Sequence, residues 1–183
     1  MLKKINISII LLTSLVSLYF AFTRDERFIY VVKDISIILT ISALYIVQKV
    51  SKIKIDEKLN FIYILFIFMA HFLGVIVDLY SKVYWFDKFV HFISGILSSV
   101  FAICILFRIK IKKNTIFCIL FIISFSMCIA SFWEIFEYMA SCLYDVDPQR
   151  VYATGISDTM EDLIVTLLGS NIISFYYYKI IFN

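Results

Sequence analysis

Proline and glycine are scarce in this sequence, and charged side chains are fewer than in a water-soluble protein. Its 183 residues include one Pro and four Gly, and 17% of them are Asp, Glu, Lys or Arg, against about 25% in soluble domains. Hydrophobic residues make up 62%, well above the roughly 45–50% of a soluble domain. This composition excludes a water-soluble globular domain, and it predicts a chain that lies in a lipid bilayer.

Several catalytic and metal-binding patterns are also missing. The four cysteines form no C-x-x-C pair, so the sequence predicts neither a disulfide framework nor a thiolate metal site. The H-E-x-x-H, G-x-S-x-G and P-loop patterns are absent. The two histidines are too few for the three-histidine centre of an intramembrane zinc hydrolase. The basic residues are placed as topology signals, so we expect no nucleic-acid partner.

Six apolar stretches are long enough, or nearly so, to cross a membrane, which takes about 20 residues. They are 5–22, 30–48, 60–80, 87–107, 115–143 and 158–182. The second is the weakest, because Lys33 and Asp34 leave an apolar core of only 35–47. The first is expected to be an uncleaved signal anchor, since no pair of small residues marks a cleavage site after it. We therefore predict an all-α, polytopic membrane protein, with all 183 residues in a single integral membrane domain, a bundle of six transmembrane helices.

Lysine and arginine are distributed unevenly between the two sides of these six spans. The N-terminus, the second loop, the fourth loop and the C-terminus together carry eleven basic residues, and the other side carries six. Because the more basic side stays in the cytoplasm, we expect both termini to be cytoplasmic. Twelve of the fourteen acidic residues then lie on the outer side. The positive-inside rule does not require this acidity, so it needs an explanation of its own.

Ionisable side chains recur at helical spacing near the outer ends of four of the spans. His71, Gly74 and Asp78 are predicted to share one stripe of the third span. An ionisable group deep in a bilayer costs about 2.5 kcal/mol or more unless it is paired or faces water, so these groups predict one pocket. Its candidate residues are Asp87, His91, Glu134, Glu137, Asp158 and Asp162, with His71 and Asp78 at its wall.

Some of these acids have a purely structural alternative. Asp158 followed by Glu161 matches a capping box, and Asp87 at a helix N-terminus suits the helix dipole. Asp78 and Glu137 lie near predicted helix C-termini, where the dipole disfavours negative charge. A structural role therefore explains the last two less well.

Positive partners for these acids are few. Lys82, Lys88 and Arg150 accompany nine acids from Asp78 to Asp162, so some carboxylates must be protonated, hydrogen-bonded, solvated or bound to a cation. Carboxylates with imidazole suit a divalent cation, but they can equally serve as general acids and bases. For a metal ion, the candidate ligands are His91, Glu134, Glu137 and Asp162.

Three motifs resemble those of a known family. "DKFVHFISG" (87–95), "WEIFEY" (133–138) and "GISDTMEDLIVTLLGS" (155–170) stand in this order on successive predicted helices. They are similar to the YjdF-like bacterial inner-membrane proteins and, more distantly, to the VanZ-like family. Gly95 stands where VanZ-like members have Tyr, which favours the YjdF-like assignment. The resemblance implies a place in the bacterial cytoplasmic membrane and supports a site at these motifs, without implying a particular reaction.

Three functions are compatible with these features. The first is an outward-facing pocket that binds or processes a cell-envelope or lipid-linked ligand, with or without a divalent cation. The second is a secondary transporter that uses the carboxylates and histidines as a proton or cation relay. The third is a membrane chaperone or assembly factor. The pocket is favoured over the transporter, because the sequence shows neither internal repeats nor Gly/Pro-broken helices. Whether the protein is an enzyme is left open.

Overall fold

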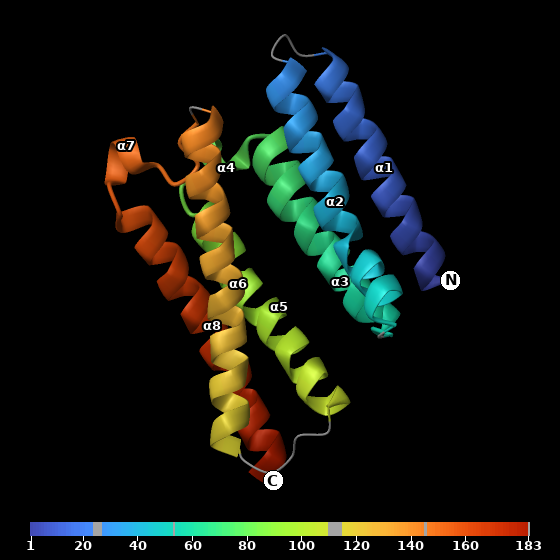
Figure 1. Ribbon diagram of the computed structural model, residues 1–183, viewed down its shortest axis with the longest axis vertical. Helices are drawn as coiled ribbons and strands as arrows, with labels where there is room; N and C mark the ends of the chain where they lie inside the picture. The colour runs from blue at the N-terminus through green and yellow to red at the C-terminus, as the bar shows by residue number, and fades with distance from the viewer. Residues whose placement is uncertain (24–26, 53, 110–114, 145, 183) are drawn as a thin grey trace. The chain divides into compact units, whose positions relative to one another are not determined.

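The structure is a computed structural model that describes residues 1–23, 27–52, 54–109, 115–144 and 146–182. Within these ranges every regular element is a helix (Figure 1). The chain divides into two compact units, Met1–Tyr84 and Trp85–Asn183. The all-α prediction is therefore confirmed for the described residues, whereas the single membrane domain stays a prediction.

The first unit is built on three long helical segments that pack together. Its elements are α1 (Leu2–Thr23), α2 (Arg27–Ser51), α3 (Glu57–Ile67), the π-helix η1 (Phe68–Ile76) and the short α4 (Leu79–Lys82). Buried Ile41, Ile64 and Ile67 form its apolar core. A polar network closes one end of this unit, because the Glu57 carboxylate accepts hydrogen bonds from Tyr45 Oη at 2.7 Å and from Asn6 Nδ2 at 3.0 Å. This network joins α1, α2 and α3.

The predicted third span, 60–80, corresponds to the candidate span Glu57–Ile76, but its expected α-helical spacing does not reach Asp78. The α-helix ends at Ile67, continues as the π-helix η1 to Ile76 and then gives way to a turn before α4. In a π-helix each backbone hydrogen bond joins residues five apart, whereas in an α-helix it joins residues four apart. The side-chain spacing of an α-helix therefore no longer applies across this segment. Asp78 lies beyond η1 in the left-handed region, with φ of 66°, so it does not share a helical stripe with His71.

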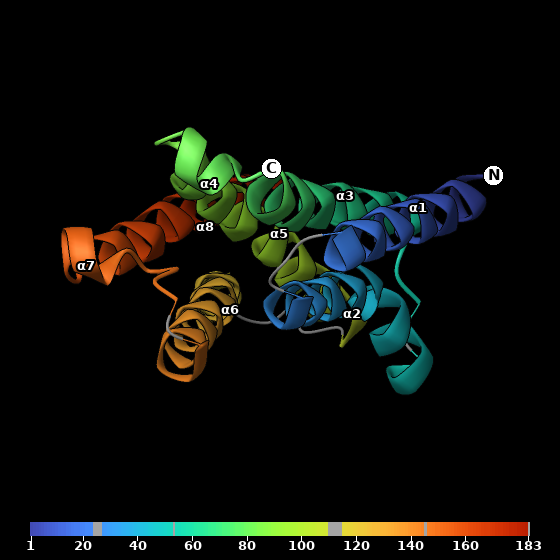
Figure 2. The same ribbon diagram turned by 90° about the horizontal axis from the view of Figure 1, so that it is seen from above.

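The second unit packs three long helices around one another. Its elements are α5 (Phe86–Arg108), α6 (Thr115–Tyr144), the short α7 (Val151–Thr154) and α8 (Ser157–Phe182). Each of the three long helices packs against the other two (Figure 2). In Figure 1, α5 and α8 run downward and α6 runs upward, so the first turns of α5 and α8 and the last turns of α6 lie at the same end of this unit. Ala102, Leu106, Cys118, Ile122 and Tyr177 form an apolar core.

Two glycines let α5 and α8 approach at backbone distance. A Cβ atom on Gly95 would overlap the carbonyl oxygen of Thr166, and one on Gly169 would overlap the carbonyl oxygen of Phe92. Small residues at a helix interface are typical of packing in membranes, where close van der Waals contact and hydrogen bonds hold helices together.

Hydrogen bonds between hydroxyl groups continue this interface. Ser99 Oγ donates to Ser170 Oγ at 2.9 Å, between α5 and α8. Ser98 Oγ donates to Ser126 Oγ at 2.8 Å, between α5 and α6. The three helices therefore have a fixed register relative to one another.

Among the described residues, four helical segments are long and apolar enough to cross a membrane. They are Leu2–Phe20, Glu57–Ile76, Phe86–Arg108 and Thr115–Tyr144. Among the described side chains of α2, Ile35–Val50 forms a shorter apolar helix. Helix α8 is 26 residues long, and its first two turns carry three acids. An all-helical protein with several candidate spans is confirmed, and the count of six spans stays a prediction.

Candidate functional site

Ionisable side chains from all three long helices of the second unit meet at one end of its bundle. The first two turns of α5 supply Asp87, Lys88 and His91, and the first two turns of α8 supply Asp158 and Asp162. Both helices use a spacing of four residues, which places the paired side chains on one face. The third helix, α6, adds Glu134, which is buried. We call Asp87, Lys88, His91, Glu134, Asp158 and Asp162 the acid cluster.

Lys88 is the basic centre of the acid cluster. Its Nζ atom lies 2.6 Å from Asp158 Oδ1, 2.9 Å from Asp162 Oδ1 and 3.6 Å from Asp87 Oδ2. Nζ also donates to the backbone carbonyl of Asp158 at 3.2 Å. The Lys88 side chain is only 19% exposed, so these contacts are shielded from water. One ammonium group thus serves several carboxylates.

His91 lies among three carboxylate oxygens without a short contact to any of them. Its Nε2 atom is 3.8 Å from Asp87 Oδ1, 3.9 Å from Glu134 Oε1 and 3.9 Å from Asp162 Oδ1. These separations exceed the 2.7–3.2 Å of a protein hydrogen bond. The imidazole nitrogen is therefore nearly equidistant from three carboxylate oxygens, which come from α5, α6 and α8.

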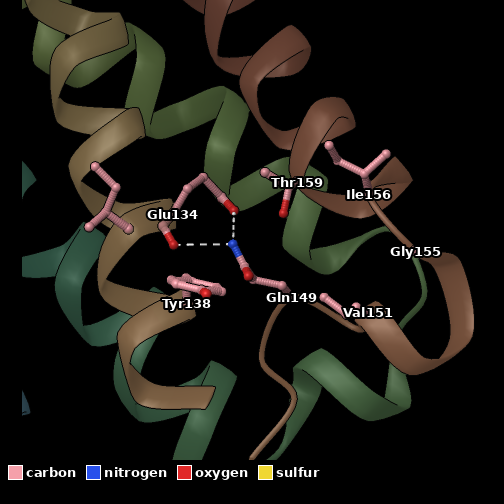
Figure 3. Close-up of a pocket in the computed structure, with 8 residues that line it drawn as sticks. Glu134, Tyr138, Gln149, Val151, Gly155, Ile156 and Thr159 are labelled. Atoms are coloured by element: carbon pink, nitrogen blue, oxygen red, sulfur yellow. Dashed lines mark hydrogen bonds between the residues drawn. The ribbon is translucent and has the colours of Figure 1, made fainter. Parts of the chain in front are cut away.

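Glu134 is held by a residue from the loop that follows α6. Gln149 Nε2 donates to Glu134 Oε2 at 3.0 Å and to the Glu134 carbonyl oxygen at 3.1 Å (Figure 3). The other carboxylate oxygen, Oε1, is buried and has no hydrogen-bond partner in the part of the chain that the structure describes. Because Oε1 is also the atom nearest His91, Gln149 orients the carboxylate so that its open oxygen points into the acid cluster.

Glu134 also lines a cavity of about 470 Å³ (Figure 3). Apolar side chains make up much of its wall, and Glu134, Gln149 and Thr159 supply polar groups. Its lining residues are Glu134, Ile135, Tyr138, Gln149, Val151, Gly155, Ile156 and Thr159. Glu134 belongs both to this cavity and to the acid cluster, so it links the two.

Five of the predicted pocket residues come together in the second unit. They are Asp87, His91, Glu134, Asp158 and Asp162. Glu137 lies one turn further along α6, is half-buried and accepts a hydrogen bond from Trp133 Nε1 at 2.8 Å. His71 and Asp78 belong to the first unit, where His71 is buried in η1 and Asp78 is exposed and accepts from Ser81 Oγ. Their place at the wall of this pocket stays a prediction.

The structure also bears on the alternative roles of the acids at helix starts. Helix α8 begins at Ser157, so Asp158 lies within the first turn, where its side chain contacts Lys88. The Glu161 side chain is 57% exposed and reaches Lys88 only at 4.0 Å.

For a metal ion, Asp87, His91 and Asp162 each offer one ligand atom within 4.8 Å of the others. This group contains two of the predicted ligands and adds Asp87.

Two residues of the site were missed as site residues by sequence reasoning. Lys88 belongs to the "DKFVHFISG" motif and to the few basic groups near the acids, but it stands outside the predicted pocket. Gln149 lies in the connection between α6 and α7, where no periodicity indicates which way a side chain points. The neighbouring Asp147 accepts hydrogen bonds from the backbone N–H groups of Val151 and Tyr152, which fixes the start of α7.

These observations define a helical integral membrane protein with a buried carboxylate–histidine cluster in its second unit. The chain belongs to the family described as "Predicted membrane protein (DUF2238)", whose model matches residues 5–182. This family agrees with the YjdF-like resemblance without confirming that name, and the VanZ-like resemblance stays an expectation.

One bacterial protein is similar to this chain in sequence. The chain is similar to an uncharacterized protein of Thermotoga maritima, with 26% identity over 131 residues. The matched segment covers 68% of this chain and 64% of that protein, less than two thirds of the relative's length. No solved structure matches the chain.

Proposed function

We propose that the second unit forms an outward-facing pocket that binds a cell-envelope or lipid-linked ligand. In this proposal the protein lies in a bacterial cytoplasmic membrane with both termini in the cytoplasm. The proposal rests on one observation: Glu134, which lines a largely apolar cavity, is a buried carboxylate with one oxygen that has no hydrogen-bond partner among the described residues.

The chemistry of the cavity favours an amphiphilic ligand. Ile135, Tyr138 and Ile156 offer apolar contacts, which suit a hydrocarbon chain or the apolar part of a lipid-linked molecule. At the end of the cavity, Glu134 is backed by further carboxylates of the acid cluster. A head group that carries an ammonium ion is therefore attracted, and one that carries only negative charge is repelled unless a cation accompanies it.

Lipid retention tests this proposal with a defined probe. The purified protein is exchanged into nanodiscs that contain equal amounts of phosphatidylethanolamine, which carries an ammonium group, and phosphatidylglycerol, which carries none. Native mass spectrometry then counts the lipids that stay bound. We expect a preference for phosphatidylethanolamine, and we expect Glu134→Gln to reduce that preference about tenfold, because a charge-assisted hydrogen bond contributes about 1.5–3 kcal/mol.

Matched variants separate cavity binding from general adhesion of lipid. Ile156→Trp fills the cavity and should lower retention of both lipids, whereas Ile164→Trp adds the same ring at an exposed position of α8 outside the cavity lining and should change nothing. If Ile156→Trp and Glu134→Gln retain lipid as the wild type does, the proposed pocket is wrong.

The orientation has its own experiment. In a cysteine-free background, Tyr152→Cys on α7 and Arg108→Cys at the end of α5 are both at exposed positions. A membrane-impermeant maleimide added to intact cells should label residue 152 and leave residue 108 unlabelled until the membrane is broken. Labelling of residue 108 alone in intact cells would place the acid cluster on the cytoplasmic side.

A further inference from the structure

We propose that Asp87, His91, Glu134 and Asp162 bind a divalent transition-metal ion of the Mn²⁺ or Zn²⁺ class. This deepens the proposed function, because it names a ligand at the inner end of the same pocket, and it rests on that function only in assuming that the pocket admits solutes. The inference is carried by the positions of four ligand atoms, by an unpartnered carboxylate oxygen and by the charge balance of the acid cluster.

The distances from the His91 nitrogen to the nearby carboxylate oxygens are slightly longer than those between two ligand atoms of one bound metal ion. His91 Nε2 lies 3.8, 3.9 and 3.9 Å from one oxygen each of Asp87, Glu134 and Asp162. Ligand atoms 2.0–2.2 Å from one tetrahedral zinc ion lie about 3.3–3.6 Å apart, so His91 Nε2 is only a few tenths of an ångström farther from each oxygen than in such a site. Asp87, His91 and Asp162 also offer one ligand atom each within 4.8 Å of the others.

An independent observation points to a ligand at this place. The Glu134 side chain is 7% exposed, and its Oε1 atom has no hydrogen-bond partner. Such an oxygen normally finds a partner, because leaving a buried charged group unsatisfied is costly. Gln149 holds the other oxygen of this carboxylate, so Oε1 is fixed in the direction of His91. A metal ion between them would satisfy it.

The charge balance favours a cation with more than one positive charge. Asp87, Asp158 and Asp162 share the ammonium group of Lys88, and Glu134 adds a fourth carboxylate near His91. A divalent ion brings the remaining charge close to zero without a new side chain. The donor set selects among such ions, because carboxylates with one imidazole suit Mn²⁺ or Zn²⁺ better than the purely oxygen-ligated Ca²⁺.

Removal of the Lys88 charge should increase the affinity for the metal ion. Its Nζ atom contacts Asp162 Oδ1 at 2.9 Å, so it repels any cation bound at the same carboxylate. Lys88→Met removes this repulsion and should tighten metal binding about tenfold or more, since unit charges a few ångströms apart interact by several kcal/mol at an effective dielectric constant of about 20. Misfolding does not produce a gain of affinity.

Mn²⁺ binding is measured by electron paramagnetic resonance on the full-length protein in detergent micelles, after removal of bound metal with a chelator. We expect one Mn²⁺ per chain, displaced by Zn²⁺. His91→Gln and Asp162→Asn should each weaken binding by about 100-fold or more, because even the loss of a group outside the ligand shell costs about 10–100-fold. Glu161→Gln is the matched control on the same turn of α8, and its exposed side chain predicts a change of less than about twofold.

The outcomes separate this inference from the proposed function. Absence of Mn²⁺ and Zn²⁺ binding by the wild type, an unchanged affinity in His91→Gln, or weaker binding in Lys88→Met would each overturn the metal site. Metal binding of the expected pattern together with lipid retention unaffected by Ile156→Trp would support the metal site and reject the lipid pocket. Lipid retention that depends on Ile156, without metal binding, would support the lipid pocket and reject the metal site.

Discussion

Replacing Gly95 with alanine should force α5 and α8 apart and destabilise the second unit. The new methyl group would overlap the carbonyl oxygen of Thr166, and it would lie 2.9 Å from the carbonyl carbon and 3.0 Å from Cα of that residue. Favourable contacts between carbon atoms have separations of about 3.5–4.0 Å. The atoms in contact belong to the backbone of a helix, so no side chain can rotate away, and the two helices must separate locally by about 1 Å.

The expected loss of stability follows from the packing and the hydrogen bonds that this separation of α5 and α8 disturbs. Overpacking of a tight interior typically costs about 1–3 kcal/mol. The hydrogen bonds from Ser99 Oγ to Ser170 Oγ at 2.9 Å and from Thr166 Oγ1 to the His91 carbonyl at 3.1 Å would be stretched, and such bonds contribute about 0.6 kcal/mol each in a membrane protein. Alanine offsets about 1 kcal/mol through its higher helix propensity. We expect a net loss of about 2 kcal/mol.

Thermal unfolding in a mild detergent, followed by circular dichroism, measures this loss. Ser94→Ala introduces the same residue one position earlier on α5 and should change stability by less than about 0.5 kcal/mol. If Gly95→Ala is as stable as the wild type, or more stable, then α5 and α8 do not approach at backbone distance at this point, and the packing described for the second unit is wrong.

Three further substitutions test other parts of the structure. Glu57→Gln removes the charge that accepts from Tyr45, and it should destabilise the first unit by about 1–3 kcal/mol, seen as a lower unfolding midpoint for segment 1–84 in hydrogen exchange. Asp147→Ala removes the cap of α7, which contributes about 1 kcal/mol, and it should speed proteolysis in the connection before α8; unchanged cleavage would contradict the cap. Gln149→Leu leaves Glu134 Oε2 without its donor, and it should lower both the unfolding midpoint and lipid retention, whereas loss of neither would show that Gln149 does not orient that carboxylate.

Much of the second unit could be predicted from the sequence, because its signals are local and repeat with the helix. Asp87 and His91, like Asp158 and Asp162, are four residues apart, and a helix places such pairs on one face whatever it packs against. The short connections also require an up-down-up order, which brings the acids of α5 and α8 to the same end. The structure accordingly places these four residues together.

The remaining features depend on interactions that no sequence period records. The π-helix η1 changes the number of residues per turn in the middle of an apolar run, so the spacing from His71 to Asp78 does not place the two side chains on one helix face. Gln149 contacts Glu134 from a loop, and loop side chains have no periodic direction. The sharing of Lys88 among several carboxylates depends on the close approach of two helices distant in sequence.

The close contact of α5 and α8 at Gly95 and Gly169 has a consequence for ligand affinity. Helix packing holds like charges of Asp87, Asp158 and Asp162 near one another within the two turns that precede this contact. Binding of any cation and tightening of the helix pair must therefore be thermodynamically linked, with equal coupling in both directions. A cation at 100 times its dissociation constant stabilises the folded bundle by about 2.7 kcal/mol. A distant substitution that disfavours the close contact of the two helices by 1.4 kcal/mol lowers the affinity for the cation about tenfold. Lipids or partner proteins that press on the outer faces of α5 and α8 would change affinity at the acid cluster without touching it.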